Sequence, residues 1–99
     1  MTTDRQKSRL GALVRFFIAN TDRYVAADLL DHPGLDRMVS DVEQAERMLL
    51  AECADQQIVE EDGDQQVEIE GIGEHERVLI THESGLWVAI TPWGDVITE

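Results

Sequence analysis

The fold is decided in the stretch ADQQIVEEDGDQQVEIE, residues 54–70, where the spacing of apolar residues changes from helical to strand-like. Before it, apolar residues recur every three or four positions, as on the buried face of a helix: Val42, Ala45, Leu49 and Cys53. Within it, Val67-Glu68-Ile69-Glu70 alternates between apolar and charged residues, which is typical of a half-buried strand. The 99-residue chain is therefore predicted to be a single α+β domain, mainly helical over residues 1–55 and mainly antiparallel β over residues 56–99.

The helical part is expected to contain three helices. In the first, the apolar residues fall on one stripe of roughly four turns: Leu10, Leu13, Val14, Phe17 and Ile18. Asn20-Thr21-Asp22 is expected to end this helix, and residues 26–31 are expected to form a short second helix that stops at His32-Pro33-Gly34. The third helix is expected to begin near Leu35 or at Ser40-Asp41-Val42-Glu43, which has the spacing of a capping box.

The β part is expected to open with a hairpin. Ile58-Val59 would begin its first strand, Glu61-Asp62-Gly63-Asp64 would form its turn and residues 67–70 its second strand, because Asp-Gly is a frequent hairpin turn. Gly71-Ile72-Gly73 is expected to separate this hairpin from the next unit. The remaining elements are strands at residues 77–82, 86–91 and 96–98, with turns at residues 83–85 and 92–95.

The order of three helices and a hairpin over residues 5–70 resembles a winged helix–turn–helix domain. The resemblance is carried by residues 40–70, where a capped helix leads through Gln56-Gln57-Ile58-Val59-Glu60 and a glycine-centred turn into Val67-Glu68-Ile69. It implies a third helix that offers donors to bases in the major groove, and a wing beside the DNA. In this chain the outward residues of both elements are acidic: Asp41, Glu43, Glu46, Glu60, Glu61, Asp62, Asp64, Glu68 and Glu70. Because carboxylates repel phosphates, we do not expect the chain to bind DNA through them.

The formal net charge of −13 is concentrated in one segment. Residues 1–47 carry −1, residues 48–76 carry −10 and residues 77–99 carry −2. Between Arg47 and Arg77 there is no Lys or Arg, but there are ten carboxylates: Glu52, Asp55, Glu60, Glu61, Asp62, Asp64, Glu68, Glu70, Glu74 and Glu76. Such a segment attracts basic surfaces and repels nucleic acid, so it predicts a positively charged protein partner. The alternative is a solvated face that only keeps the protein soluble.

Two features of the second half are typical of a protein-binding surface. Glu68 and Glu70 would lie about 6.6 Å apart on one face of a strand, at ~3.3 Å per residue. Phosphates along one strand of DNA are spaced on a similar scale, so such carboxylates can occupy a groove built for nucleic acid. Trp87 and Trp93 are expected to pair near the turn after residues 86–91, as an exposed binding hot spot. The alternative is that both indoles cover the open side of a small sheet.

No cofactor, metal site or enzymatic activity is expected. The sequence contains no glycine-rich phosphate loop, Ser-His-Asp arrangement or paired-acid motif in its usual context. A calcium loop beginning at Asp62 fails, because Val67 and Gly73 occupy places that require a glycine and an acid. His75 and His82 lack the further ligands that a zinc site needs.

The expected compartment is the cytoplasm. The chain has a single cysteine, so it cannot form an internal disulfide. No apolar run approaches membrane-spanning length, and the N-terminal sequence is too polar for a secretory signal. We therefore expect no contact with a membrane.

Taken together, these features favour a small non-enzymatic inhibitor that acts as a DNA mimic. It would dock its acidic face on the basic groove of a nucleic-acid-binding protein or defence complex, without binding nucleic acid itself. In size and charge it resembles inhibitors encoded by phages and plasmids. The expected partner-binding residues are the ten carboxylates above together with Trp87 and Trp93. The alternatives are a winged-helix regulator that contacts DNA through Arg5, Lys7, Arg9 and Arg15, and a structural or assembly subunit. Formation of a homodimer is left open.

Overall fold

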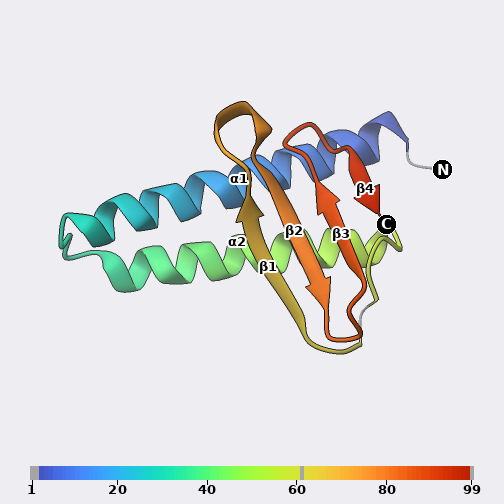
Figure 1. Ribbon diagram of the computed structural model, residues 1–99. Coiled ribbons are helices and arrows are strands. Elements are labelled where there is room, and N and C mark those ends of the chain that lie inside the picture. Colours follow the sequence, from blue (N-terminus) through green and yellow to red (C-terminus); the bar gives the residue numbers. More distant parts are fainter. Residues whose placement is uncertain (1–2, 61, 99) are drawn as a thin grey trace.

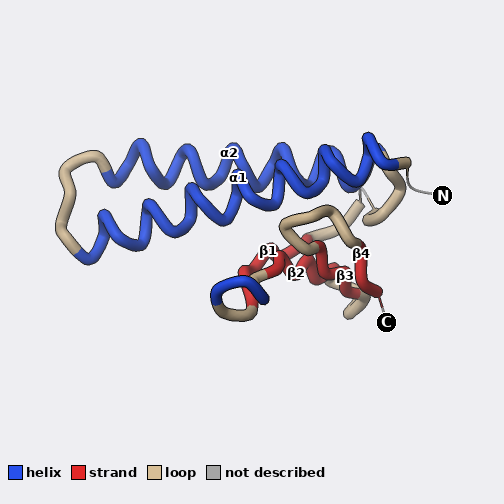
Figure 2. Tube along the Cα trace, turned by 90° about the horizontal axis from the view of Figure 1, so that it is seen from above, coloured by secondary structure: helices blue, strands red, loops and turns tan. Residues whose placement is uncertain are grey.

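The computed structural model describes residues 3–60 and 62–98, which form two helices followed by a four-stranded antiparallel sheet (Figure 1). The elements are α1 (Asp4–Leu29), α2 (Leu35–Asp55), β1 (Gln65–Glu70), the short 3-10 helix η1 (Gly73–His75), β2 (Arg77–His82), β3 (Trp87–Ile90) and β4 (Val96–Thr98). The two helices form an antiparallel hairpin, and the sheet packs against one face of it, so the structure has two layers (Figure 2). The α+β class agrees with the sequence prediction.

The prediction of three helices is wrong, because α1 continues without a break through the expected turn at residues 20–22. There Asn20 Nδ2 donates to the Phe16 carbonyl at 2.8 Å. Thr21 Oγ1 donates to the Phe17 carbonyl at 2.9 Å. Polar side chains that bond back to the preceding turn in this way are compatible with a continuous helix.

The expected second helix at residues 26–31 is instead the C-terminal end of α1 and the first residues after it. The chain reverses in a short loop, in which His32 N donates to the Ala27 carbonyl at 2.9 Å and Asp31 has a φ of 52°. α2 begins at Leu35, the earlier of the two expected starts. With two helices in place of three, the chain does not have the winged helix–turn–helix arrangement.

The strands follow one another in the order β1-β2-β3-β4, each antiparallel to its neighbour. The prediction of the first hairpin is wrong, because Ile58-Val59 forms no strand and β1 pairs with β2. Ile58 N donates to the Cys53 carbonyl at 2.8 Å, and Gln57 has a φ of 59°. This turn places both apolar side chains against the core. Gly71-Ile72-Gly73 consequently lies in the connection between the paired strands β1 and β2.

The core lies where the sheet crosses the two helices. Its buried residues are Leu10, Val14 and Phe17 of α1, Ala45, Leu49 and Cys53 of α2, and Val78, Ile80, Val88 and Ile90 of the sheet. Phe17 is 5% exposed and Leu49 is 0% exposed, as expected for residues in the middle of the two helical stripes. Because both helices and the sheet contribute, neither the hairpin nor the sheet has a complete core of its own.

The sheet covers only the half of the hairpin that contains the start of α1 and the end of α2 (Figures 1 and 2). The strands run across the helices, and β1 is the strand nearest to the loop between α1 and α2 (Figure 1). The other half of the hairpin carries exposed apolar side chains, with Val25 49%, Leu29 78% and Leu30 81% exposed. The molecule is therefore elongated, with extents of 44 × 28 × 21 Å.

The turn between β3 and β4 packs closely on α1. A Cβ atom added to Gly94 would overlap the Lys7 carbonyl, and one added to Gly11 would lie 2.8 Å from the Pro92 oxygen. Arg15 Nη1 donates to the Pro92 carbonyl at 2.6 Å. The two glycines thus allow the backbone of the β3–β4 turn to approach the backbone of α1. The guanidinium group of Arg15 then links α1 to the turn.

Phe17→Ala and Leu49→Ala should each lower the free energy of unfolding by about 2–5 kcal/mol, because each leaves a cavity in the core. Denaturant unfolding followed by circular dichroism measures the change. Phe16→Ala is the matched control, because Phe16 is 47% exposed on the same helix. Its unfolding should stay close to that of the wild type, and an equal loss in Phe16→Ala and Phe17→Ala would contradict the packing.

Gly94→Ala should destabilise the protein by about 1–3 kcal/mol more than Gly85→Ala. Both glycines have a left-handed backbone, with φ of 88° and 94°, so both substitutions carry the same conformational cost. Only at Gly94 does the added methyl group meet backbone, whereas at Gly85 it meets nothing within 4 Å. Thermal unfolding of the two variants measures the difference, and equal melting temperatures would show that the turn does not dock on α1.

Candidate functional site

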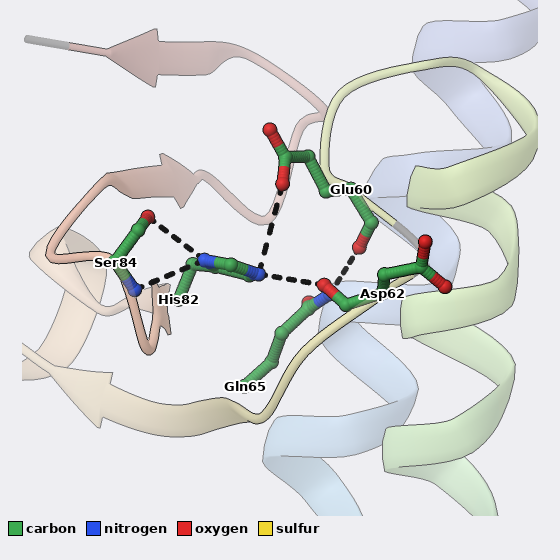
Figure 3. Close-up of polar contacts among 5 residues, drawn as sticks. All are labelled: Glu60, Asp62, Gln65, His82 and Ser84. Atoms are coloured by element: carbon green, nitrogen blue, oxygen red, sulfur yellow. Dashed lines mark hydrogen bonds and ion pairs between the residues drawn. The ribbon is translucent and has the colours of Figure 1, made fainter.

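The loop between α2 and β1 is held against the sheet by His82 (Figure 3). His82 Nε2 lies 2.7 Å from the Asp62 carbonyl oxygen, and His82 Nδ1 accepts from the Ser84 backbone N–H at 3.1 Å. Since Nδ1 is an acceptor, the hydrogen of the neutral ring is on Nε2, which donates it to Asp62. The carboxylate of Glu60 lies 3.8 Å from the same nitrogen, and Gln65 Nε2 donates to the Glu60 carbonyl. These contacts fix an acidic loop at the start of β1.

Seven carboxylates lie along β1 and the connections at its two ends. We call this set the acidic edge: Glu60, Asp62, Asp64, Glu68, Glu70, Glu74 and Glu76. Glu70 and Glu76 are half-buried, and the other five are exposed. Among the described strands, β1 is one of the two outermost. Of the other predicted partner-binding carboxylates, Asp55 is exposed at the end of α2, and Glu61 lies outside the described residues.

Two of the predicted partner-binding carboxylates are paired with an arginine of the chain. Glu52 is 9% exposed. Its Oε1 lies 2.7 Å from Arg9 Nη2, and its Oε2 accepts from Gln56 Nε2 at 3.0 Å, so it joins α2 to α1. Glu70 Oε1 lies 2.5 Å from Nε of Arg77, the residue opposite it on β2. The pair of phosphate-like carboxylates expected on β1 therefore has one member that is already ion-paired.

Trp87 is the first residue of β3, and Trp93 lies in the turn between β3 and β4. Trp87 is half-buried and borders a cavity of about 650 Å³ between the sheet and the end of α2, together with Ile58 and Val59. Trp93 is 68% exposed, and the Arg15 guanidinium lies 5.6 Å from its ring centroid, within the range of a cation–π contact. Trp93 thus lies against Arg15 of α1, whereas Trp87 borders the cavity beside the end of α2.

The basic residues at the start of α1 are mostly engaged within the chain. Lys7 Nζ lies 2.6 Å from Asp95 Oδ1, and their hydrogen bond raises the pKa of Lys7 and lowers the pKa of Asp95. Arg9 binds the α2 carboxylate described above, and Arg15 binds the β3–β4 turn. Among the described residues, Arg5 alone of these four has no ion pair and no side-chain hydrogen bond. Three of the four candidate DNA contacts are therefore already paired within the chain.

Neither described helix is apolar enough over a sufficient length to cross a bilayer. Within residues 3–60 and 62–98, no three His, Cys, Asp or Glu side chains are grouped so that they could hold a metal ion. Burial raises the pKa of the Cys53 thiol to about 12, which keeps it protonated and unreactive at neutral pH. Comparisons with protein-family models, curated proteins and solved structures give no match to this chain.

Arg9→Ala should lower the free energy of unfolding by about 1–3 kcal/mol, because it leaves the Glu52 carboxylate buried without its cation. Arg5→Ala is the matched control, since it removes the same charge from the same helix but breaks no described ion pair. Denaturant unfolding at neutral pH measures both. If Arg5→Ala lowers the free energy of unfolding as much as Arg9→Ala does, the effect does not come from the ion pair of Arg9 with Glu52.

Proposed function

We propose that this chain is a non-enzymatic inhibitor that acts in the cytoplasm by binding a positively charged protein partner through the acidic edge. The observation that carries the proposal is the gathering of seven carboxylates on one outermost strand and its connections. Five of the seven are exposed. Mutual repulsion among these carboxylates does not stabilise the fold. The arrangement is therefore better explained by a partner than by the fold.

The shape of the acidic edge supports a partner whose groove accepts nucleic acid. A strand of six residues extends about 20 Å at roughly 3.3 Å per residue. It is rigid because the sheet holds it, and His82 fixes the acidic loop at its start. A fixed row of carboxylates imitates the charge of a phosphate backbone but carries no bases. It would therefore occupy and block the groove, and the partner could not cleave or copy it as it would a nucleic acid.

The placement of the basic residues argues against DNA binding by the free protein. Lys7, Arg9 and Arg15 bind groups within the chain, and contact with phosphates would require each of them to exchange its partner. The net charge of −13 opposes the approach to DNA as well. The proposed partner is accordingly a protein, and nucleic acid competes with this chain for it.

The association with the partner should weaken steeply between about 50 mM and 500 mM salt, because exposed charges are screened over this range. The double variant Asp62→Lys with Glu68→Lys should reduce the affinity at low salt by about tenfold or more. Asp28→Lys with Asp36→Lys is the matched control, with the same change of net charge on the hairpin. The partner is isolated by affinity capture from a host lysate, and titration calorimetry of the purified pair measures the affinity.

Two results would contradict the proposal. One is an affinity that does not change with salt, since the binding would then not depend on exposed charges. The other is an equal loss in the acidic-edge variant and in the hairpin control, which would mean that net charge matters and position does not. Duplex DNA added to the complex should displace the chain, while a mobility-shift assay with the free chain should show no DNA complex.

A further inference from the structure

One side of β1 carries backbone groups that have no strand beside them. The Asp64 carbonyl accepts from Glu83 N at 2.8 Å, which makes these two residues a hydrogen-bonded pair at the start of β1. In an antiparallel ladder such pairs alternate, so Gln66, Glu68 and Glu70 bond to β2. The N–H and C=O groups of the residues between them, Gln65, Val67 and Ile69, point away from the sheet. Among the described strands, only β2 pairs with β1.

The side chains of β1 alternate in the same way. Val67 and Ile69 point towards the helices, where they pack against the core, and both are half-buried. Glu68 lies on the opposite face of the sheet and is exposed. Edge strands are usually kept from pairing by charge, by proline or by short length. β1 has six residues and no proline, and the protective feature in its own sequence is the charge of Glu68 and Glu70.

The half of the helical hairpin that the sheet does not cover begins beside β1, the edge strand of the sheet (Figures 1 and 2). On α1, Ile18 packs against the core, and Asp22, Val25 and Leu29 continue the same face at three- and four-residue intervals. Val25 and Leu29 are 49% and 78% exposed. A strand added beside β1 would lie about 4.8 Å further along the hairpin, over the start of this face.

On α2, the corresponding face contains Glu46 one turn before Leu50, followed towards the hairpin loop by Val42 and Val39. Burial and the neighbouring Glu43 raise the pKa of Glu46. Exposed apolar residues of α1 and half-buried apolar residues of α2, with Asp22 and Glu46 among them, therefore form the surface onto which the inner side chains of an added strand would pack.

A second copy of this chain is a poor occupant. If β1 paired with β1 of another copy, the acidic outer faces of the two strands would lie side by side, and like charges on neighbouring strands destabilise a sheet. Each copy would also bring a net charge of −13. An extended segment with basic side chains on its outer face avoids this charge repulsion. Opposite charges across two strands stabilise their pairing instead.

We propose that β1 accepts an extended peptide segment of the partner as a fifth strand, in which apolar side chains towards the hairpin alternate with Lys or Arg side chains beside the acidic edge. The backbone groups of Val67 and Ile69 would bind its main chain, as in other cases of strand addition. This inference rests on the proposed function and adds the form in which the partner binds.

The test uses a synthetic nine-residue peptide in which lysine alternates with valine, with blocked ends. Its controls are a peptide of the same composition with the valines in one block, and one with glutamate in place of lysine. The alternating peptide should bind at least about tenfold more tightly than either, measured by fluorescence anisotropy. On binding, amide exchange of Val67 and Ile69, followed by NMR, should slow, and exchange of Glu68 should not change because its N–H already bonds to β2.

Two variants separate the backbone contribution from the charge. Val67→Pro removes one open N–H without touching the ladder to β2, because proline is tolerated on that side of an edge strand. It should weaken the alternating peptide by about tenfold, the ratio expected for one backbone hydrogen bond. Val67→Thr keeps the N–H and the branched shape and should bind like the wild type. Melting temperatures of both variants verify that each is folded. The amide-exchange measurement uses the wild-type chain, so it tests strand addition without any variant.

Each other outcome overturns the proposal. If Glu68→Lys weakens binding but Val67→Pro and amide exchange do not respond, the acidic edge acts by charge alone, and the proposed function stands without strand addition. If neither the peptide nor the captured partner responds to Glu68→Lys, both proposals fail. If sedimentation shows a dimer of the wild type that Val67→Pro dissociates, the occupant of β1 is a second copy.

Discussion

The packing of α1 against α2 is the constraint on which the rest of this structure depends. A four-stranded sheet with one apolar face has to bury that face, and the helical hairpin is the surface available to it. The hairpin is fixed at the covered end by Leu10 and Leu49 in the core and by the ion pair of Arg9 with Glu52. The sheet packs on the half of the helical hairpin where both helices contribute buried residues.

The length of α1 follows from the same constraint and has a consequence for function. α1 continues past the region that the sheet covers, with Asn20 and Thr21 bonded back to the preceding turn. A helix that ended there would have left a shorter hairpin and no uncovered half. The continuous helix instead provides an apolar surface directly beside β1, the strand that carries Glu68. Charge and apolar surface are thus brought together by the geometry of the hairpin.

Local patterns predicted much of the fold. The stripes that end at Ile18 and Cys53, and the strands at residues 77–82, 86–91 and 96–98, follow from periodicity that each segment carries by itself. The errors fall where a local signal has two structural solutions. Residues 20–22 are typical of a turn, but they lie in a helix that packs along α2, and such packing supplies most of the stability of helices in proteins. Ile58-Val59 has strand propensity, but the left-handed residue before it turns both side chains into the core.

The sequence by itself determined the charge of the candidate site, because carboxylates and the absence of lysine and arginine are matters of composition. It also placed Glu68 and Glu70 on one strand, which the structure has as β1. Only the tertiary structure decided which of them stay free, since Arg9 reaches Glu52 and Arg77 reaches Glu70 through contacts between distant segments. It likewise decided that β1 is an edge, because strand order arises from long-range hydrogen bonds for which a strand's own residues contain no signal.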